Sequence, residues 1–183
     1  MQVSASRFPS VVDDVTVRLI AAVVLVIGVV ALVTSQWWLY AVLAVDFSLR
    51  AALKPSASPI ARLVQRWIRP AVPAAKRPTA GPPKRFAATI GAFLTVAATA
   101  LWLISLTTGP SGSSGVMVAV VAVGAVMVVF PALESILGIC VGCILFSGLM
   151  RLGLIPEEVC LECADITKRR ERLVAEQAGR QAA

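Results

Sequence analysis

Four long runs of apolar residues constrain this chain more than any other feature. Three of them hold no more than two charged residues each, and the fourth has Glu134 as its only charge. A helix of about 20 apolar residues crosses the roughly 30 Å hydrocarbon core of a bilayer. With 58% hydrophobic and 15% charged residues, the chain is also too apolar for an ordinary soluble domain. We therefore expect transmembrane helices in Val15–Thr34, Trp37–Leu53, Phe86–Leu106 and Val116–Met150.

The fourth run is longer than a bilayer core is thick. At about 1.5 Å per residue, a straight helix over Val116–Met150 would measure roughly 50 Å. We expect its last two or three turns to leave the membrane, tilt or bend, and Pro131 and Gly138 are the residues that favour a bend. The first run is not expected to be a cleaved signal peptide, because Asp13 and Asp14 stand where such a peptide carries basic residues.

The distribution of positive charge predicts the orientation of the spans. Lys54–Arg85 contains eight Lys and Arg residues and no acidic residue, whereas Ser35–Gln36 and Thr107–Gly115 carry no charge. Loops rich in Lys and Arg stay in the cytoplasm, so the basic segment is expected inside. An even number of spans then places both termini on the cytoplasmic side.

The basic segment has two interpretations, and we prefer the simpler one, a topology signal. As a binding surface it would attract anionic lipid headgroups or an acidic partner protein, and nucleic acid is not the expected ligand. Its seven prolines favour extended backbone over part of its length. Ile60–Ile68 is predicted to form a short interfacial helix within it.

The chain is predicted to contain two copies of one helical hairpin in the same orientation. Val45–Leu53 aligns with Val129–Leu137, and Arg18 and Arg85 each open an apolar helix. The expected fold is all-α. In chain order it has a cytoplasmic N-terminus, a transmembrane hairpin, a basic cytoplasmic loop, a second hairpin and a cytoplasmic tail with a helix over Glu157–Gln177. The boundaries of these five parts are 1–14, 15–53, 54–85, 86–150 and 151–183.

Besides Arg18 near the start of the first span, three charged residues fall within the predicted spans. Asp46 and Arg50 are four residues apart, and the alignment puts Glu134 where the first copy has Arg50. Charged groups at this depth cost a few kcal/mol each, so they usually face the interior of a bundle and pair. We expect an intramembrane Asp46–Arg50–Glu134 cluster that joins the two halves. The alternatives are a proton or ion path, or an Arg50 side chain that reaches the cytoplasmic surface.

All four cysteines lie in the last quarter of the chain, as two C-x-x-C pairs with sixteen residues between them. This C-x2-C-x16-C-x2-C spacing qualifies as a four-thiolate zinc site, and an iron–sulfur cluster would use the same ligands. A redox dithiol has the same C-x-x-C spacing, and cytoplasmic thiols are normally reduced, which argues against permanent disulfides. The chain has no histidine, so a Cys/His nucleophile pair is excluded. The pairs are Cys140–Cys143 and Cys160–Cys163.

The surroundings of the cysteines weaken the zinc interpretation. Ile139–Phe146 has the composition of a helix, whereas zinc knuckles are polar turns. Cys160 and Cys163 follow Pro156, which predicts the first turns of a helix, where the helix dipole favours a thiolate. The neighbouring Glu157, Glu158 and Glu162 oppose that effect, so no net shift in acidity is predicted. On a straight helix Glu134 points to the face opposite Cys143, so no catalytic role is predicted for Glu134.

Three strings in the sequence carry a family resemblance. They are Asp46-Phe-x-x-Arg50, the stretch Gly81–Gly91, and Leu133-Glu134 followed by Gly138-Ile-Cys-Val-Gly-Cys143. Together, within Val15–Met150, they resemble a bacterial integral membrane family of unknown function. Members of that family are often encoded beside thioredoxin-like proteins and sulfurtransferases. The resemblance implies thiol or sulfur chemistry in the bacterial cytoplasmic membrane, and it implies functional positions at Asp46, Arg50, Glu134, Cys140 and Cys143.

Three functional hypotheses follow, and the sequence does not decide whether the protein is an enzyme. The first is a membrane-anchored dithiol module that exchanges electrons or sulfur with a thioredoxin-like or sulfurtransferase partner, with the first cysteine pair working and the second acting as a relay. The second is a scaffold whose four thiolates hold zinc or an iron–sulfur cluster. The third is a small transporter centred on the three intramembrane charges, which would have to form oligomers because four helices enclose only a narrow pore.

Overall fold

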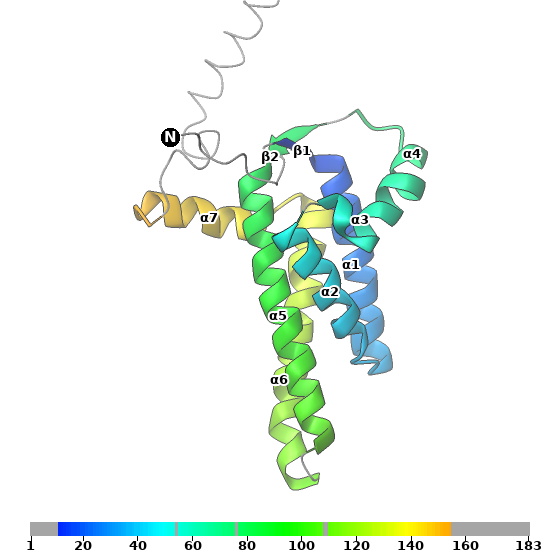
Figure 1. Ribbon diagram of the computed structural model, residues 1–183, viewed down its shortest axis with the longest axis vertical. Coiled ribbons are helices and arrows are strands. Elements are labelled where there is room, and N and C mark those ends of the chain that lie inside the picture. The colour runs from blue at the N-terminus through cyan, green and yellow to red at the C-terminus, as the bar shows by residue number, and fades with distance from the viewer. Residues whose placement is uncertain (1–10, 54, 76, 108–109, 155–183) are drawn as a thin grey trace, which may run out of the picture.

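Long helices dominate the computed structural model of this chain, which describes residues 11–53, 55–75, 77–107 and 110–154 (Figure 1). Helices α1 (Asp14–Thr34), α5 (Gly81–Thr107) and α6 (Pro110–Ala132) are the long ones. Within the described ranges, three helical stretches are long and apolar enough to cross a membrane, the third being Gly115–Leu137. The predicted helical membrane protein is confirmed at this level.

The second predicted span is shorter than expected. Helix α2 (Leu39–Ala52) has 14 residues, so it measures roughly 21 Å at about 1.5 Å per residue. Trp37 and Trp38 precede it in a turn, and Leu53 ends it. The helix is thus about two turns shorter than the thickness of a typical bilayer core.

The outward faces of the long helices are apolar, as contact with lipid requires. No more than 28% of the residues in the most apolar stretch of each span are buried inside the bundle. The remaining positions hold side chains such as Val33, Phe93 and Val118, which are strongly exposed. A helix that is apolar on all sides is buried in a large core or in a membrane, and these helices have little protein around them.

Each helix of the first hairpin packs against one helix of the second. Helix α2 packs against α5, and α6 packs against α1. Arg18, near the start of α1, lies against Gly138 beyond the end of the second hairpin. Arg85, near the start of α5, donates a hydrogen bond to the Ala51 carbonyl at the end of the first hairpin. This exchange of arginine contacts is the arrangement expected of two related hairpins, although the duplication itself stays a prediction.

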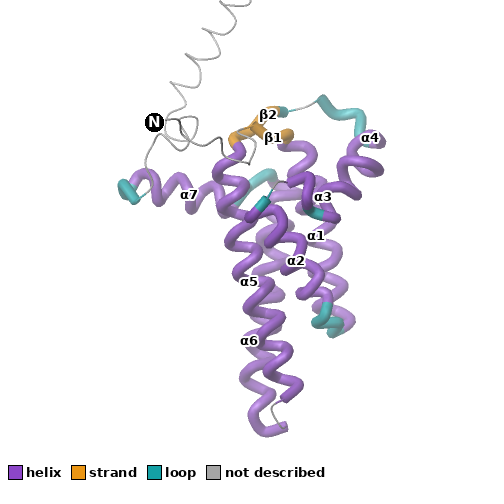
Figure 2. Tube along the Cα trace, in the orientation of Figure 1, coloured by secondary structure: helices purple, strands orange, loops and turns teal. Residues whose placement is uncertain are grey.

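The basic segment folds into short pieces at one end of the bundle (Figure 2). The predicted helix over Ile60–Ile68 is confirmed, and the Ser58 hydroxyl caps it by accepting from the Ala61 N–H at 3.0 Å. Strand β1 (Val11–Asp13) pairs antiparallel with β2 (Pro78–Ala80). The helical pieces are a 3-10 turn, Pro55–Ala57, then α3 (Pro59–Leu63), a π-helix, Val64–Ile68, and α4 (Arg69–Ala71).

Two helix starts differ from the sequence-based boundaries. Helix α5 begins at Gly81, five residues before the expected Phe86, so Lys84 and Arg85 belong to a helix and not to the loop. Helix α6 begins at Pro110, inside the stretch expected to be a turn. Both starts have proline in the first helical turn, where its missing N–H leaves no hydrogen bond unmade.

The fourth apolar run bends, as its length predicts. Helix α6 continues into a π-helix, Leu133–Leu137, and stops at Gly138, whose φ of 71° is left-handed. The N–H of Ile139 then bonds the Leu133 carbonyl, which closes the helix end. The following helix, α7 (Val141–Arg151), runs across the direction of α5 and α6 (Figure 1).

Helix α7 is held against α5 by a close approach of small residues. A side chain at Gly142 would collide with Ala87 of α5. Phe146 of α7 also packs against Phe86, with ring centroids 5.6 Å apart. The predicted tail helix, Glu157–Gln177, lies outside the described residues.

We predict that Gly138→Ala destabilises the fold. A left-handed backbone costs an alanine about 1–2 kcal/mol, and the new methyl group would displace the Arg18 guanidinium. The thermal unfolding midpoint in detergent micelles should fall. Gly148→Ala is the control, because no atom lies within 4 Å of a side chain added there. Equal midpoints for the two variants would contradict the prediction.

Candidate functional site

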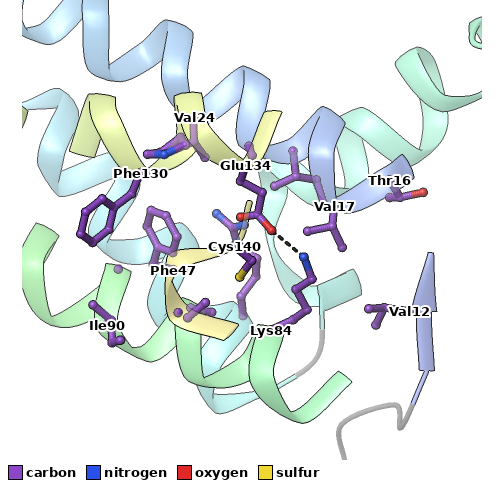
Figure 3. A pocket seen from close by; sticks show the side chains of 18 of the residues that line it. Val12, Thr16, Val17, Val24, Phe47, Lys84, Ile90, Phe130, Glu134 and Cys140 are labelled. Carbon is purple, nitrogen blue, oxygen red and sulfur yellow. Dashed lines mark hydrogen bonds and ion pairs between the residues drawn. The ribbon is translucent and has the colours of Figure 1, made fainter. Parts of the chain in front are cut away.

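A cavity of about 660 Å³ lies among α1, α2, α5, the π-helix Leu133–Leu137 and the start of α7 (Figure 3). Most of its lining is apolar, including Ile20, Val24, Phe47 and Phe130. It lies at the end of the bundle that carries the ion pairs, which we call the charged end. Its polar lining residues are Asp13, Thr16, Arg50, Ser56, Gln65, Arg69, Lys84, Glu134 and Cys140.

An ion pair between Lys84 and Glu134 joins α5 to the π-helix Leu133–Leu137 that follows α6. Lys84 Nζ lies 2.6 Å from Glu134 Oε1, and both side chains are largely buried (Figure 3). Asp14 Oδ1 is a second acidic neighbour, 3.6 Å from Lys84 Nζ. Lys84 was counted above only among the loop charges, so sequence reasoning missed it. The paired prolines Pro82 and Pro83 were the available signal, because they favour a helix start before Lys84.

The predicted pair of Asp46 and Arg50 is present. Asp46 is fully buried and accepts from Arg50 Nη2 at 2.5 Å, from the Ser58 hydroxyl, and from the Ile60 N–H at 3.0 Å. The guanidinium of Arg50 also lies 4.3 Å from the Phe47 ring centroid. This network joins the end of α2 to the start of α3.

Glu134 belongs to this region through a different contact from the one expected. Its direct partner is Lys84, and it acts on Arg50 only as an opposite charge at longer range. Arg50 and Glu134 nevertheless line the same cavity. The structure therefore brings the three predicted residues together and adds Lys84 to them.

The N-terminus of α7 is formed by the first C-x-x-C pair. Cys140 is the N-cap of α7, and its Sγ accepts a hydrogen bond from the Cys143 N–H at 3.3 Å. Both cysteines are free thiols, with Cys140 buried in the cavity wall and Cys143 partly exposed. The sequence instead predicted a helix start at the second pair, Cys160 and Cys163, which lies outside the described residues.

The bend at Gly138 also overturns the straight-helix geometry that kept Glu134 away from the thiols. Helix α6 ends before the cysteines, and the chain turns back so that Cys140 and Glu134 line one cavity. Lys84 and Glu134 both act electrostatically on Cys140. The thiol of Cys140 thus lies within the field of a buried ion pair.

The surroundings shift the pKa values of the two thiols in opposite directions. A hydrogen bond from the Cys143 thiol lowers the pKa of Cys140, and so do the positive charge of Lys84 and the hydrogen bond from the Cys143 N–H. Burial and the negative charge of Glu134 raise that pKa, but by less. The pKa of Cys143 is raised, first because its thiol donates to Cys140 and second because it is buried. A helix N-terminus also stabilises a thiolate. Cys140 is therefore the more acidic thiol of the pair and the one that loses its proton first.

Asp13 fixes the rim of the cavity. It accepts hydrogen bonds from the Thr16 hydroxyl at 2.7 Å and from Arg69 Nε and the Arg77 N–H, each at 2.9 Å. Burial alone would raise the pKa of Asp13, but these hydrogen bonds lower it well below its ordinary value of 3.8. The carboxylate therefore stabilises the fold above that pH, and its contribution is lost only as the pH falls well below 3.8.

The four-thiolate metal site stays a prediction. Across the part of the chain that the structure describes, no three Cys, Asp or Glu side chains come together as a metal site would require. Cys160 and Cys163, which would complete it, are not in that part.

The fold and this site define a helical protein of the membrane type in which two free thiols, one buried and one partly exposed, lie beside an ion pair. The chain belongs to the family described as Domain of unknown function (DUF4395), which matches residues 12–151. The match spans α1 to α7 and includes Cys140 and Cys143, whereas Cys160 and Cys163 fall outside it. No curated protein and no solved structure is detectably similar to the chain.

We predict unequal reactivity of the two thiols. In a Cys160→Ser/Cys163→Ser background, iodoacetamide should modify Cys140 first, and its rate should level off below the ordinary thiol pKa of 9.0, because the thiolate is already formed there. Peptide mass spectrometry over a pH series measures both sites. Equal rates for Cys140 and Cys143 at every pH would contradict the assignment.

We also predict opposite effects of the two charges beside Cys140. Lys84→Met should move the midpoint of the Cys140 alkylation profile to higher pH by about 1 unit, because an attractive charge is lost. Glu134→Gln should move it to lower pH, since a repulsive charge is lost. Arg66→Gln is the control, because it removes a positive charge from an exposed side chain that does not line the cavity. Shifts in the same direction for Lys84→Met and Glu134→Gln would rule out this electrostatic arrangement.

Proposed function

We propose that this protein is a dithiol module of the bacterial cytoplasmic membrane that exchanges electrons with a thioredoxin-like partner through Cys140 and Cys143. The observation that carries the proposal is the position of Cys140 at the N-cap of α7, where the Cys143 N–H donates to its sulfur. A thiol pair placed in this way has one sulfur ready as a thiolate and the second held as a proton donor.

The proposal includes four spans with both termini in the cytoplasm. Helix α1 leaves the charged end and α2 returns to it, since Asp46 in the second half of α2 accepts a hydrogen bond from Ser58 of the basic segment. A short helix such as α2 spans where the bilayer thins locally. The basic residues of this segment, at the same end as α7, favour a cytoplasmic location for the dithiol.

Exposure and acidity assign a role to each sulfur in the reduction of the Cys140–Cys143 disulfide. A thiolate of the partner attacks the partly exposed sulfur of Cys143, so the intramolecular S–S bond breaks and Cys140 leaves as a thiolate. Thiols of lower pKa are the better leaving groups. The second thiol of the partner then loses its proton and attacks the mixed disulfide, which releases Cys143. Cys143 takes up that proton, and two electrons have moved from the partner to the pair.

The test is thiol–disulfide exchange with purified bacterial thioredoxin in detergent micelles. Reduced thioredoxin should open the Cys140–Cys143 disulfide, as measured by maleimide labelling and mass shift. A thioredoxin variant that lacks its second cysteine should accumulate a mixed disulfide at Cys143. Cys143→Ser should prevent this adduct, whereas Cys160→Ser/Cys163→Ser should leave it intact.

Metal content measured on the same preparation separates the competing scaffold hypothesis. A metal-free protein whose first thiol pair closes and opens supports the dithiol module. About one zinc per chain, with four thiols protected until denaturation, would exclude the module and favour the four-thiolate scaffold.

A further inference from the structure

We propose that the cavity beside Cys140 binds a quinone, which accepts two electrons from the dithiol, with its carbonyl oxygens near Lys84 and Arg50 and its ring against the apolar wall. This inference rests on the proposed function, because the quinone would take the electrons that the thioredoxin-like partner supplies. It names the second substrate of the same site.

The cavity extends from the charged end into the depth of the spans. Its lining residues on α1 run from Thr16 to Val24, a length of roughly 12 Å at about 1.5 Å per residue. On α5 they run from Lys84 to Gly91. A ligand in this cavity would have its polar part at the membrane boundary and its apolar part within the hydrocarbon layer.

The two sulfurs face different surroundings. Cys140 is only 9% exposed and lines the cavity, whereas Cys143 is partly exposed and does not line it. A partner protein cannot reach a sulfur buried in a cavity wall, but a small molecule inside the cavity can. The arrangement therefore gives the dithiol a protein-facing sulfur and a cavity-facing sulfur.

The size and polarity of the cavity fit an amphiphilic ring compound. Its volume of about 660 Å³ lies within the range of small-molecule pockets, about 300–1,000 Å³. Val17, Ile20 and Phe130 contribute to the apolar wall, and Lys84 and Glu134 lie beside Cys140 (Figure 3). Quinones are membrane-soluble acceptors of two electrons, whereas a phospholipid would fit the apolar wall but accepts none.

Arg50 supplies an independent indication of a bound ligand. It lines the cavity, and its buried Nε–H has no hydrogen-bond partner in the described part of the chain. Buried donors are normally satisfied, because a buried donor without an acceptor loses the hydrogen bond that it would make with water. A carbonyl oxygen of a quinone is an acceptor that this donor lacks.

The electron transfer balances with these groups. The Cys140 thiolate bonds to a ring carbon of the quinone, and one ring oxygen takes up a proton. Cys143 then loses its proton and its sulfur attacks Cys140 Sγ, so the carbon–sulfur bond breaks and its electron pair enters the ring. The second ring oxygen takes up a proton. The dithiol becomes a disulfide and the quinone becomes a hydroquinone, with two electrons transferred.

The experiment uses decylubiquinone and the pre-reduced Cys160→Ser/Cys163→Ser protein in detergent micelles without oxygen. We expect hydroquinone, followed by ultraviolet absorbance, to form in stoichiometric amount while Cys140 and Cys143 close to a disulfide. Val17→Phe fills the cavity and should slow this reaction at least tenfold. Val26→Phe is the matched control on the same helix, because Val26 is 61% exposed and does not line the cavity.

Binding is measured apart from electron transfer in a Cys140→Ser/Cys143→Ser variant. Decylubiquinone should raise its thermal unfolding midpoint, and adding Val17→Phe should abolish the increase. Equal quinone reduction by the Val17→Phe and Val26→Phe proteins would overturn the proposal. It would also be overturned if phospholipid gave the same Val17-dependent stabilisation and decylubiquinone gave none.

The two proposals fail in distinguishable ways. A pair that exchanges with thioredoxin but does not reduce decylubiquinone would reject the quinone site and leave the dithiol module standing. A pair that cycles with neither would reject both. Exchange with thioredoxin should be unchanged in the Val17→Phe protein, because that substitution leaves the exposed sulfur of Cys143 untouched.

Discussion

The backbone of Gly138 adopts a left-handed conformation that glycine accepts at little cost. The direction of the chain after Gly138, and so the position of the first cysteine pair, depends on this conformation. A continuous helix would have carried the cysteines away from Glu134. Because the chain turns at Gly138, a new helix begins at Val141, and the Cys143 N–H in its first turn donates to the sulfur of Cys140. One turn thus creates both the helix N-terminus and the cavity wall, while Arg18 of the first hairpin covers the glycine from the other side.

Paired charges make this turn compatible with its apolar surroundings. Near the charged end, three carboxylates each form an ion pair with a basic side chain. The pairs are Asp13–Arg69, Asp46–Arg50 and Glu134–Lys84. An isolated charge at such a depth would be expensive, and a paired one is tolerated when further hydrogen bonds satisfy it. Each pair also joins separate elements or anchors the segment that follows it, so the pairs fix the walls of the cavity. Arg69 and Lys84 thus belong both to the basic segment from which the orientation is predicted and to the lining of the candidate site.

The two sulfurs differ in acidity and in exposure, and this difference suits them to separate roles. The thiol with the lowered pKa faces an apolar cavity, and the thiol with the raised pKa is the more exposed one. In thiol–disulfide exchange, the attacked sulfur is the accessible one and the leaving sulfur is the one that is stable as a thiolate. The arrangement therefore suits a pair that receives electrons from one side and delivers them on the other.

The sequence by itself determined the features that depend on local composition and periodicity. Long apolar runs become helices, Ile60–Ile68 becomes a short helix, and Asp46 meets Arg50 because residues four apart share a helix face. The excess length of the fourth run also predicted that it would bend. Only the tertiary structure decided that Lys84 pairs with Glu134 and that Cys140 faces the same cavity. These contacts join α5, the end of α6 and the start of α7, and no periodicity within one helix reports the direction that a chain takes after a turn such as Gly138.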